Sequence, residues 1–161
     1  MTDATPLTIR RLCPADVPLM QAMTRMFAEA FDEPETYVGQ PPGRGYLERL
    51  LYREGFIALV AVKGGVVVGG LVAYELEKFE RERREIYIYD LAVAEPHRRR
   101  GIATGLIGEL RRIGAERGAW VIFVQADYGD DPAIALYEKL GDREEVLHFD
   151  IPVRLSPRPP R

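Results

Sequence analysis

The sequence predicts one mixed α+β domain built around a central, mostly antiparallel sheet flanked by helices. Its 161 residues, 47% of them hydrophobic, suffice for one substantial core and are few for two. Short β-branched runs alternate with segments of helical periodicity, without a repeated β-α-β unit. Several runs in the middle of the chain follow one another directly, which is typical of a meander. We place the domain at residues 1–154 and a flexible, proline-rich tail at 155–161.

The first fifty residues predict a strand followed by two helices. The strand is expected at residues 7–11. Asp16 then stands at the N-cap position of a helix whose apolar residues recur at helical spacing up to residue 31. Residues 34–45 are rich in proline and glycine, which predicts a loop that can border a substrate cleft. A second, short helix follows, and its apolar residues are Tyr46, Leu47, Leu50 and Leu51.

The next forty residues predict the meander. Residues 56–62 and 66–75 are apolar and β-branched, so we expect two antiparallel strands. The turn between them is Lys63-Gly64-Gly65, whose glycines supply the positive φ angles that a tight reversal requires. Residues 77–85 carry charges of both signs and predict a solvated connection. Residues 86–93 then predict a third, strongly apolar strand.

The last third predicts two helices and two strands. Apolar residues recur at helical spacing between Gly101 and Gly118, which indicates an amphipathic helix of about four turns. Residues 121–125 predict a strand. A short helix should follow, capped by Asp131 with Pro132 at its first position. Residues 146–151 predict the final strand.

Charge and composition narrow the function and the compartment. The net charge of −3 gives no overall basic field, which disfavours a nucleic-acid binder. Residues 125–150 contain eight acidic and two basic residues, a balance of −6 that should attract cations. The single cysteine, Cys13, cannot form an intramolecular disulfide, and no cluster with metal-ligand spacing is present. With no signal sequence or membrane-spanning run, we expect a soluble, cytoplasmic protein without a metal or a membrane partner.

Residues 98–103, Arg-Arg-Arg-Gly-Ile-Ala, lie between a predicted strand and the first turn of a predicted helix. The free N–H groups and the positive dipole end of such a helix favour an anion. The small residues Gly101 and Ala103 let a phosphate approach the main chain, and Thr104 belongs to the same first turn. Arginines add bidentate phosphate donors. The sequence therefore predicts a phosphate site here. The alternative is that these arginines are only a solvated, basic start of the helix.

This turn is similar to the Arg/Gln-x-x-Gly-x-Gly/Ala pattern of the GNAT superfamily of N-acetyltransferases, and the order of the flanking elements agrees. The resemblance implies a GNAT fold and acetyl-CoA as cosubstrate, with its pyrophosphate at the turn. It further implies that the main chain of one strand end binds the pantetheine arm and that a late helix lines the cofactor. The implied cofactor residues are Leu91, Ala92, Val93, Arg98, Arg99, Arg100, Gly101, Ile102, Ala103, Thr104, Ala133, Ala135 and Tyr137.

Four longer strings, at residues 56–60, 86–93, 124–133 and 147–151, resemble the type I aminoglycoside 3-N-acetyltransferases within that superfamily. The resemblance implies acetylation of an aminoglycoside, at the 3-amino group of the deoxystreptamine ring, and antibiotic resistance. It also implies a homodimer, because dimers are common in the family. A polycationic acceptor agrees with the acidic segment, since carboxylates bind ammonium groups through charge-assisted hydrogen bonds. The expected substrate-binding residues are Tyr87, Asp90, Asp127, Asp130 and Asp150.

Acetyl transfer to an amine needs a base for the amine and an acid for the leaving thiolate. Asp90 is the first candidate base, because a carboxylate in an apolar strand must be either satisfied or functional. It can instead bind a substrate ammonium, and Glu85 or Tyr87 can act through a water. Tyr137 resembles the superfamily tyrosine that protonates the sulfur of CoA, although it can equally be a core aromatic.

Two other functions remain open at this point. One is a GNAT acetyltransferase that acts on polyamines or on N-terminal or lysine amines of proteins, with the same cofactor turn and another acceptor cleft. The other is a CoA-binding regulatory module without turnover. Such a module should have lost Tyr137 or the carboxylate of the strand, and both are present.

Overall fold

A computed structural model describes residues 5–154 of the chain, so the predicted tail at 155–161 lies outside the described residues. The chain divides between Gln125 and Ala126 into two compact units. The larger unit contains the sheet and three α-helices, and the smaller one contains a single α-helix. Within residues 5–154, no helix is both long enough and apolar enough to cross a membrane.

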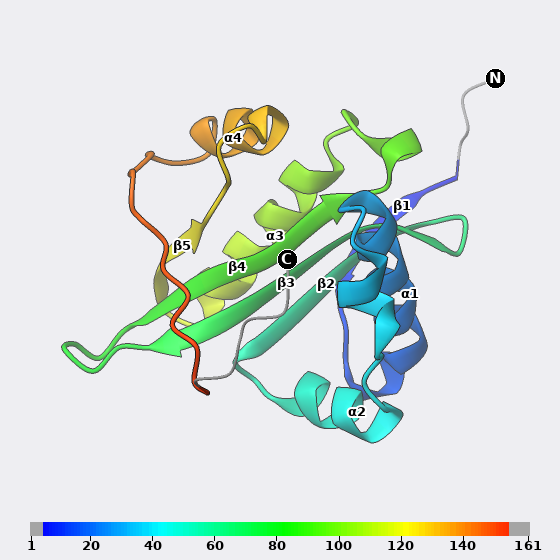
Figure 1. The fold of residues 1–161 in the computed structure, drawn as a ribbon, viewed down its shortest axis with the longest axis horizontal. Coiled ribbons are helices and arrows are strands. Elements are labelled where there is room, and N and C mark those ends of the chain that lie inside the picture. Colours follow the sequence, from blue (N-terminus) through cyan, green and yellow to red (C-terminus); the bar gives the residue numbers. More distant parts are fainter. Residues whose placement is uncertain (1–4, 155–161) are drawn as a thin grey trace. The chain divides into compact units, whose positions relative to one another are not determined.

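The larger unit is built on a five-stranded mixed sheet (Figure 1). Its strands follow one another across the sheet in sequence order. The first three pairings are antiparallel and the last is parallel, because a helical crossover connects the last two strands. The predicted α+β class is therefore confirmed. The strands are β1 Leu7–Arg11, β2 Phe56–Lys63, β3 Val66–Glu77, β4 Arg84–Val93 and β5 Ala119–Val124.

Helices cover both faces of this sheet (Figure 1). Helices α1 (Val17–Ala30) and α2 (Arg44–Tyr52) share one buried cluster with Phe56 and Val72. Helix α3 (Ile102–Glu116) covers the opposite face. Two consecutive glycines of β3 allow this close approach from both sides. A Cβ on Gly70 would lie 2.5 Å from the sulfur of Met23 in α1, and one on Gly69 would lie 2.9 Å from Ile102 in α3.

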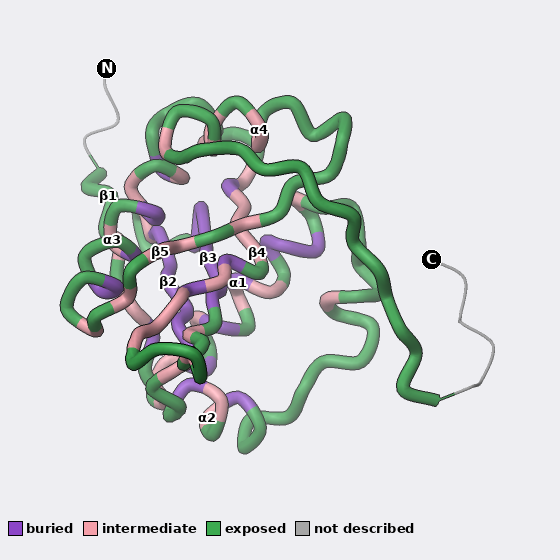
Figure 2. Tube along the Cα trace, turned by 90° about the vertical axis from the view of Figure 1, so that its left-hand side faces the viewer, coloured by how far each residue is buried: buried purple, intermediate pink, exposed green. Residues whose placement is uncertain are grey.

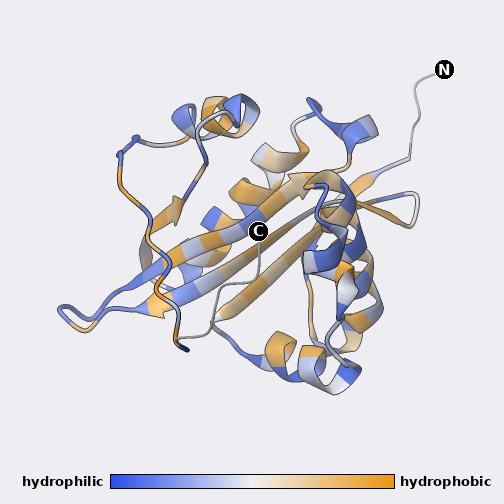
Figure 3. Ribbon diagram, in the orientation of Figure 1, coloured by the Kyte–Doolittle hydropathy of each residue, from blue (hydrophilic) through white to orange (hydrophobic). Residues whose placement is uncertain are grey.

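The core of the larger unit lies between the helices and the two central strands. Strand β2 is buried from Phe56 to Ala61 and is apolar along nearly its whole length (Figures 2 and 3). Strand β3 is buried from Val67 to Ala73. Such continuous runs indicate strands covered on both faces, where alternation with polar residues is not needed. Gly64 and Gly65 have φ angles of 58° and 78°, so the predicted tight turn between β2 and β3 is confirmed.

Strand β4 contains a β-bulge. Val72 pairs with Asp90 and the next residue, Ala73, pairs with Ile88, so Tyr89 is an extra residue without a partner in β3. The pairing of β4 with β5 ends at Ile88 and Val124. Beyond the bulge, residues 89–93 of β4 continue without β5 beside them. A bulge of this kind bends the strand and redirects side chains, often next to a functional site.

The structure differs from the sequence prediction at two places in the larger unit. The proline- and glycine-rich segment contains the helical turn η2 (Glu35–Gly39), where we predicted only loop. The charged run at 77–85 is partly sheet, because β3 continues to Glu77 and β4 begins at Arg84. The ion pairs of Arg84 with Glu75 and Glu77 account for this extension, since they join the strand ends across the sheet.

The smaller unit contains helix α4 (Asp131–Glu138). The predicted cap is displaced by one residue, because Asp130 is the N-cap and its side chain accepts a hydrogen bond from the N–H of Ala133 at 3.3 Å. Asp131 is instead the first helical residue, which places Pro132 second.

The predicted strand at 146–151 is wrong, because these residues have no regular structure. Their apolar side chains Val146, Leu147, Phe149 and Ile151 are exposed. A strand is defined by hydrogen bonds to a neighbouring strand, and the described part of the smaller unit contains none. The alternation of apolar residues therefore predicted a strand, but the described part of this unit offers no partner strand for it.

Candidate functional site

The turn between β4 and α3 has the geometry of an anion site. After β4, a short turn of 3-10 helix, η3 (Glu95–His97), brings the chain to Arg98 and then to the start of α3. Arg99 and Gly101 have φ angles of 60° and 78°, a conformation that is strained for most residues and accessible to glycine. A side chain at Gly101 would meet no atom within 4 Å, so the space in front of the helix is open.

The first N–H groups of α3 are available as donors. Gly105 is the first residue of the helix ladder, since its N–H donates to the carbonyl of Gly101 at 2.9 Å. The N–H groups of Ile102, Ala103 and Thr104 precede that bond, and no side chain caps this end of the helix. The side chain of Ile102 is buried against the sheet, so this residue contributes only its main chain. These donors and the helix dipole favour a phosphate here.

The three arginines of the turn differ in their surroundings. The Nε of Arg98 donates to the carbonyl of Val93 at 3.0 Å, which holds the turn against the end of β4. Arg99 and Arg100 follow it and, like Arg98, are exposed. Arg98 therefore orients the turn while it contributes positive charge, and the other two supply charge at the mouth of the helix.

The end of β4 leaves a free sheet edge beside this turn. Leu91, Ala92 and Val93 pair with β3 on one side and have no β5 partner on the other within the described residues. Unpaired main-chain groups of this kind bind an extended ligand as an added strand. The structure thus brings together the strand edge and the phosphate turn, as the sequence predicted.

Asp90 lies at the bulge with its carboxylate half-buried. Tyr37 donates a hydrogen bond from its hydroxyl to Oδ1 of Asp90 at 3.1 Å. Burial raises the pKa of Asp90 above the usual value for a carboxyl group, the hydrogen bond from Tyr37 lowers it, and the charge of Glu33 raises it further. The net pKa shift is upward, so this carboxylate is a stronger base than one in water.

The bulge directs two consecutive residues to one face of the sheet. Tyr89 contacts the rings of Tyr74 and Tyr87. Tyr74 in turn contacts Phe56, which packs with α1 and α2. Asp90 reaches Tyr37, which also packs on the α1 side. In a regular strand, neighbouring side chains point to opposite faces. Only the extra residue places Tyr89 and Asp90 on the same side.

Tyr37 is a site residue that sequence reasoning missed. It lies in η2, and its ring contacts those of Phe27 and Phe31 from α1, at centroid distances of 6.0 and 5.6 Å. Burial and the nearby charge of Asp90 raise the pKa of Tyr37, so its hydroxyl remains a hydrogen-bond donor. The surrounding prolines and glycines suggested an irregular loop, and no local pattern connects this tyrosine to a residue 53 positions away.

We expect Tyr37→Phe to raise the pKa of Asp90. The substitution removes a hydrogen bond that stabilises the carboxylate and keeps the ring that packs against α1, so the protonated form should gain at the same pH. Carbon-13 NMR titration of the Asp90 carboxyl measures the shift. Tyr46→Phe, on the exposed side of α2, is the matched control and should leave that titration in place; an unchanged pKa in Tyr37→Phe would contradict the role given to this bond.

Two other predicted residues of β4 are engaged elsewhere. Tyr87 donates to Oε1 of Gln125 at 2.8 Å, and its ring stacks on Phe123. Glu85 lies 3.6 Å from the ammonium of Lys78 and accepts from the indole of Trp120 at 3.3 Å. Glu85 and Asp90 are five positions apart in the strand, roughly 16 Å of extended chain. The geometry therefore favours Asp90 over Glu85 as the base.

The predicted acidic residues of the smaller unit have different surroundings. Asp127 is exposed, and Asp130 is occupied as the cap of α4. Oδ1 of Asp150 lies 2.9 Å from Nε2 of His148, within hydrogen-bond distance. The sequence did not indicate this partner. The cap explains one carboxylate, whereas Asp127 has no comparable structural role in its unit.

Tyr137 and Ala133 both lie in α4 and are partly buried. Burial, with a contribution from the charge of Asp130, raises the pKa of Tyr137 to about 12. Its phenol therefore stays protonated at neutral pH and is available as a proton donor. Ala135 of this helix is exposed.

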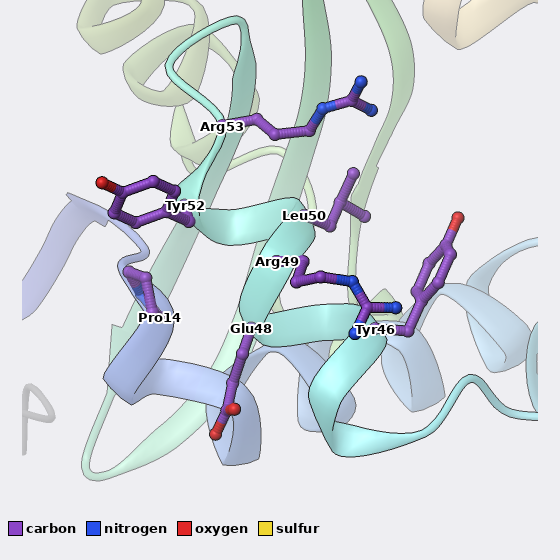
Figure 4. A pocket seen from close by; sticks show the side chains of 7 residues that line it. All are labelled: Pro14, Tyr46, Glu48, Arg49, Leu50, Tyr52 and Arg53. Atoms are coloured by element: carbon purple, nitrogen blue, oxygen red, sulfur yellow. The ribbon is translucent and has the colours of Figure 1, made fainter.

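A hollow that borders α2 is separate from the turn at residues 98–104. It has a volume of about 610 Å³ and is lined by Pro14, Tyr46, Glu48, Arg49, Leu50, Tyr52 and Arg53. Figure 4 shows the side chains of α2 pointing in different directions, with Tyr52 on the side of Pro14 and Tyr46 on the other. They do not converge on one point, and two arginines disfavour a cation. This hollow is not the candidate site.

Residues 20–142 match the model of the acetyltransferase (GNAT) family. The chain belongs to this family. It is therefore an acetyltransferase, and GNAT enzymes use acetyl-CoA. The phosphate turn and the free edge of β4 fit that cosubstrate: the helix N–H groups and arginines suit its phosphates, and the edge suits its amide-containing arm. Among residues 5–154, no group of three or more metal-binding side chains is present.

Two solved structures of aminoglycoside acetyltransferases from uncultured soil metagenomic samples resemble this GNAT chain. HMB0005 is 60% identical with a TM-score of 0.91, over 92% of this chain and 99% of that one. The protein meta-AAC0020, in complex with sisomicin, is 33% identical with a TM-score of 0.85, over 92% and 97%.

A third relative is the probable N-acetyltransferase family 8 member 5 of Mus musculus, which is 28% identical over 94 residues. That match covers 58% of this chain and 41% of the mouse protein, so the chain spans about two fifths of that relative's length.

Proposed function

We propose that this enzyme transfers the acetyl group of acetyl-CoA to an amino group of an aminoglycoside, at the 3-amino position of the deoxystreptamine ring, and so confers resistance. The observation that carries the acceptor class is the 60% identity, over nearly the whole chain, to an aminoglycoside acetyltransferase. The half-buried carboxylate of Asp90 and the acidic balance of residues 125–150 support a cationic acceptor.

The proposed chemistry divides among three parts of the chain. Acetyl-CoA supplies a thioester that a neutral amine can attack. The turn at Arg98 to Thr104 and the edge of β4 hold this cosubstrate through main-chain donors and positive charge. Asp90 accepts the proton that the acceptor amine loses, because its raised pKa brings it closer to that of the amine. Tyr37 holds the carboxylate in place.

Tyr137 is the proposed donor of a proton to the leaving thiolate. Its pKa of about 12 keeps the phenol protonated at neutral pH, so the proton is present when the thiolate forms. Ala133 and Ala135, on the same helix, are the proposed neighbours of the cosubstrate. Each of these assignments rests on the resemblance of α4 to the corresponding superfamily helix.

The decisive experiment measures thiol release from acetyl-CoA against a panel of aminoglycosides and polyamines, with mass spectrometry and NMR of the products. Acetylation of aminoglycosides, with NMR assignment to the 3-amino group, is the expected result. Turnover of polyamines or peptide amines alone would contradict the proposal and favour the alternative acceptor class.

We expect Asp127→Asn to raise the KM for aminoglycosides roughly two- to fivefold, while the KM for acetyl-CoA stays the same, because an exposed ammonium–carboxylate pair contributes up to about 1 kcal/mol. Added salt should weaken acceptor binding to the wild type. Steady-state kinetics with each substrate varied measures both effects. Asp142→Asn, another exposed carboxylate of the same segment, is the control. Equal acceptor kinetics in the two variants would remove Asp127 from the proposed set.

A further inference from the structure

A row of aromatic side chains crosses four strands of the sheet. We call Phe56, Tyr74, Tyr89, Tyr87 and Phe123 the aromatic row. Their ring centroids follow one another at 5.4, 5.8, 5.8 and 4.8 Å. Each distance lies within the range of direct aromatic contact, so the five rings form one continuous surface from β2 to β5.

The strand register places the row on one face of the sheet. Phe56 is paired with Tyr74, Tyr74 with Tyr87, and Tyr87 with Phe123, so these four side chains share a face. The bulge adds Tyr89 to them. Phe56 belongs to the buried cluster beneath α1 and α2, which identifies the face.

Exposure is lowest at Phe56, beneath these helices, and highest at Tyr89 in the middle of the row. Phe56 is 3% exposed, whereas Tyr89 is 63% exposed. Tyr74 and Phe123 are also partly open to solvent. Packing of the core explains why Phe56 is in the row. It does not explain Tyr89, whose ring is exposed although it contacts Tyr74 and Tyr87. A contiguous exposed aromatic surface on a small domain indicates a binding site.

The charges near the row favour a cation. Asp90 follows Tyr89 directly. Burial raises the pKa values of both Tyr74 and Tyr87, and the charge of Asp90 raises them further. Glu33 acts on Asp90 in turn. Arg53, directly after α2, is the cation that acts on Tyr74, and it lowers the pKa of that tyrosine. Asp90 acts on both Tyr74 and Tyr87, whereas Arg53 acts on Tyr74, so the charge beside the exposed part of the row is negative.

The row suits one ligand chemistry in particular. A six-membered saccharide or aminocyclitol ring has apolar C–H faces that stack on aromatic rings, while its hydroxyl groups stay at the edge. An ammonium group on such a ring gains further from the negative face of a tyrosine and from a nearby carboxylate. A neutral or acidic sugar would gain only the first of these contributions.

We propose that the aromatic row is the platform on which an amino-sugar ring of the acceptor stacks, with Tyr89 as its exposed central contact and Asp90 beside it. This inference rests on the proposed function and assigns the acceptor's ring recognition to the sheet face of the larger unit. The bulge in β4 then serves two purposes, because it places the stacking ring and the proposed base next to each other on one face.

Direct binding tests the platform without turnover. The Kd of sisomicin is measured by calorimetry for the wild type, Tyr89→Leu and Tyr89→Phe. Leucine keeps apolar bulk but removes the π face, so we expect the Kd to rise by roughly 5- to 30-fold. Phenylalanine keeps the ring, so its Kd should stay within about twofold of the wild type. Tyr52→Leu, an exposed tyrosine of α2 outside the row, is the matched control and should bind normally.

The outcomes separate the platform from the proposed function. If the wild type does not bind or acetylate aminoglycosides, the proposed function fails and the platform fails with it. If the wild type binds sisomicin and Tyr89→Leu, folded by circular dichroism, binds it equally well, the platform alone is overturned. Equal losses in Tyr89→Leu and Tyr89→Phe would show that the hydroxyl binds the ligand, which also contradicts stacking. Equal losses in Tyr89→Leu and Tyr52→Leu would overturn the assignment to this row.

Discussion

Replacing Gly101 by glutamate is expected to abolish measurable binding of acetyl-CoA. Gly101 is the N-cap of α3 with a φ angle of 78°, in front of the unpaired N–H groups of the helix. A glutamate there is strained, and its carboxylate occupies the region that favours the cosubstrate's phosphate and repels it. Calorimetric titration with acetyl-CoA measures the loss.

Two further variants separate charge from strain in this experiment. Gly101→Asn introduces a side chain that tolerates positive φ and carries no charge, so it should retain much of the binding. Gly108→Glu adds the same charge to the same helix at an exposed position where a Cβ meets no atom within 4 Å. Its binding should be close to that of the wild type. Normal binding by a folded Gly101→Glu protein would show that the phosphates bind elsewhere.

Asp90→Asn is expected to lower kcat/KM by about 10²–10⁴, the usual contribution of one positioned base. Asparagine keeps the size of the side chain and can still accept the hydrogen bond from Tyr37, so packing should survive. The wild-type rate should rise with pH as Asp90 loses its proton, at a pH above that of an ordinary carboxyl because burial raises its pKa. In Asp90→Asn this part of the acidic limb should disappear.

The pH profile of kcat/KM distinguishes the base from a substrate ligand. An intact acidic limb together with weaker aminoglycoside binding would identify Asp90 as a ligand of the ammonium, with the proton passing to water. Asp32→Asn, an exposed carboxylate after α1, is the control and should change neither the rate nor the limb. In Tyr37→Phe the limb should move to higher pH with the same acceptor, since the amine contributes equally to both profiles.

Local patterns predicted the parts of the site that depend on local structure. The phosphate turn follows from a glycine between a strand and a helix, and the structure places its free N–H groups where the sequence indicated. The free edge at Leu91 to Val93 does not follow from local pattern alone, because it exists only beyond the point where the pairing with β5 ends. The polar environment of Asp90 was inferred from a carboxylate in an apolar strand, while its partner Tyr37 came from a distant turn.

The failed predictions have the same origin. The alternation of apolar residues at 146–151 describes a chain that can be a strand, but a strand also requires a partner that its own sequence does not contain. Asp131 and Asp130 are both suitable caps, and only the fold of the loop decides which of them accepts the N–H of Ala133. Helices and tight turns are closed by residues a few positions apart, so they were predicted more accurately.

The sequence by itself therefore determined the α+β class, the order of the strands and α-helices as far as α4, the glycine turn between β2 and β3 and the uncapped start of α3, because hydrogen bonds between near neighbours and the burial of periodic apolar faces set each of them. The tertiary structure decided the bulge at Tyr89, the hydrogen bond between Tyr37 and Asp90, and the continuous aromatic row. These features arise from strand register and from contacts between residues far apart in the chain. A shift of one residue in the pairing of β3 and β4 would separate them, and no local pattern fixes that register.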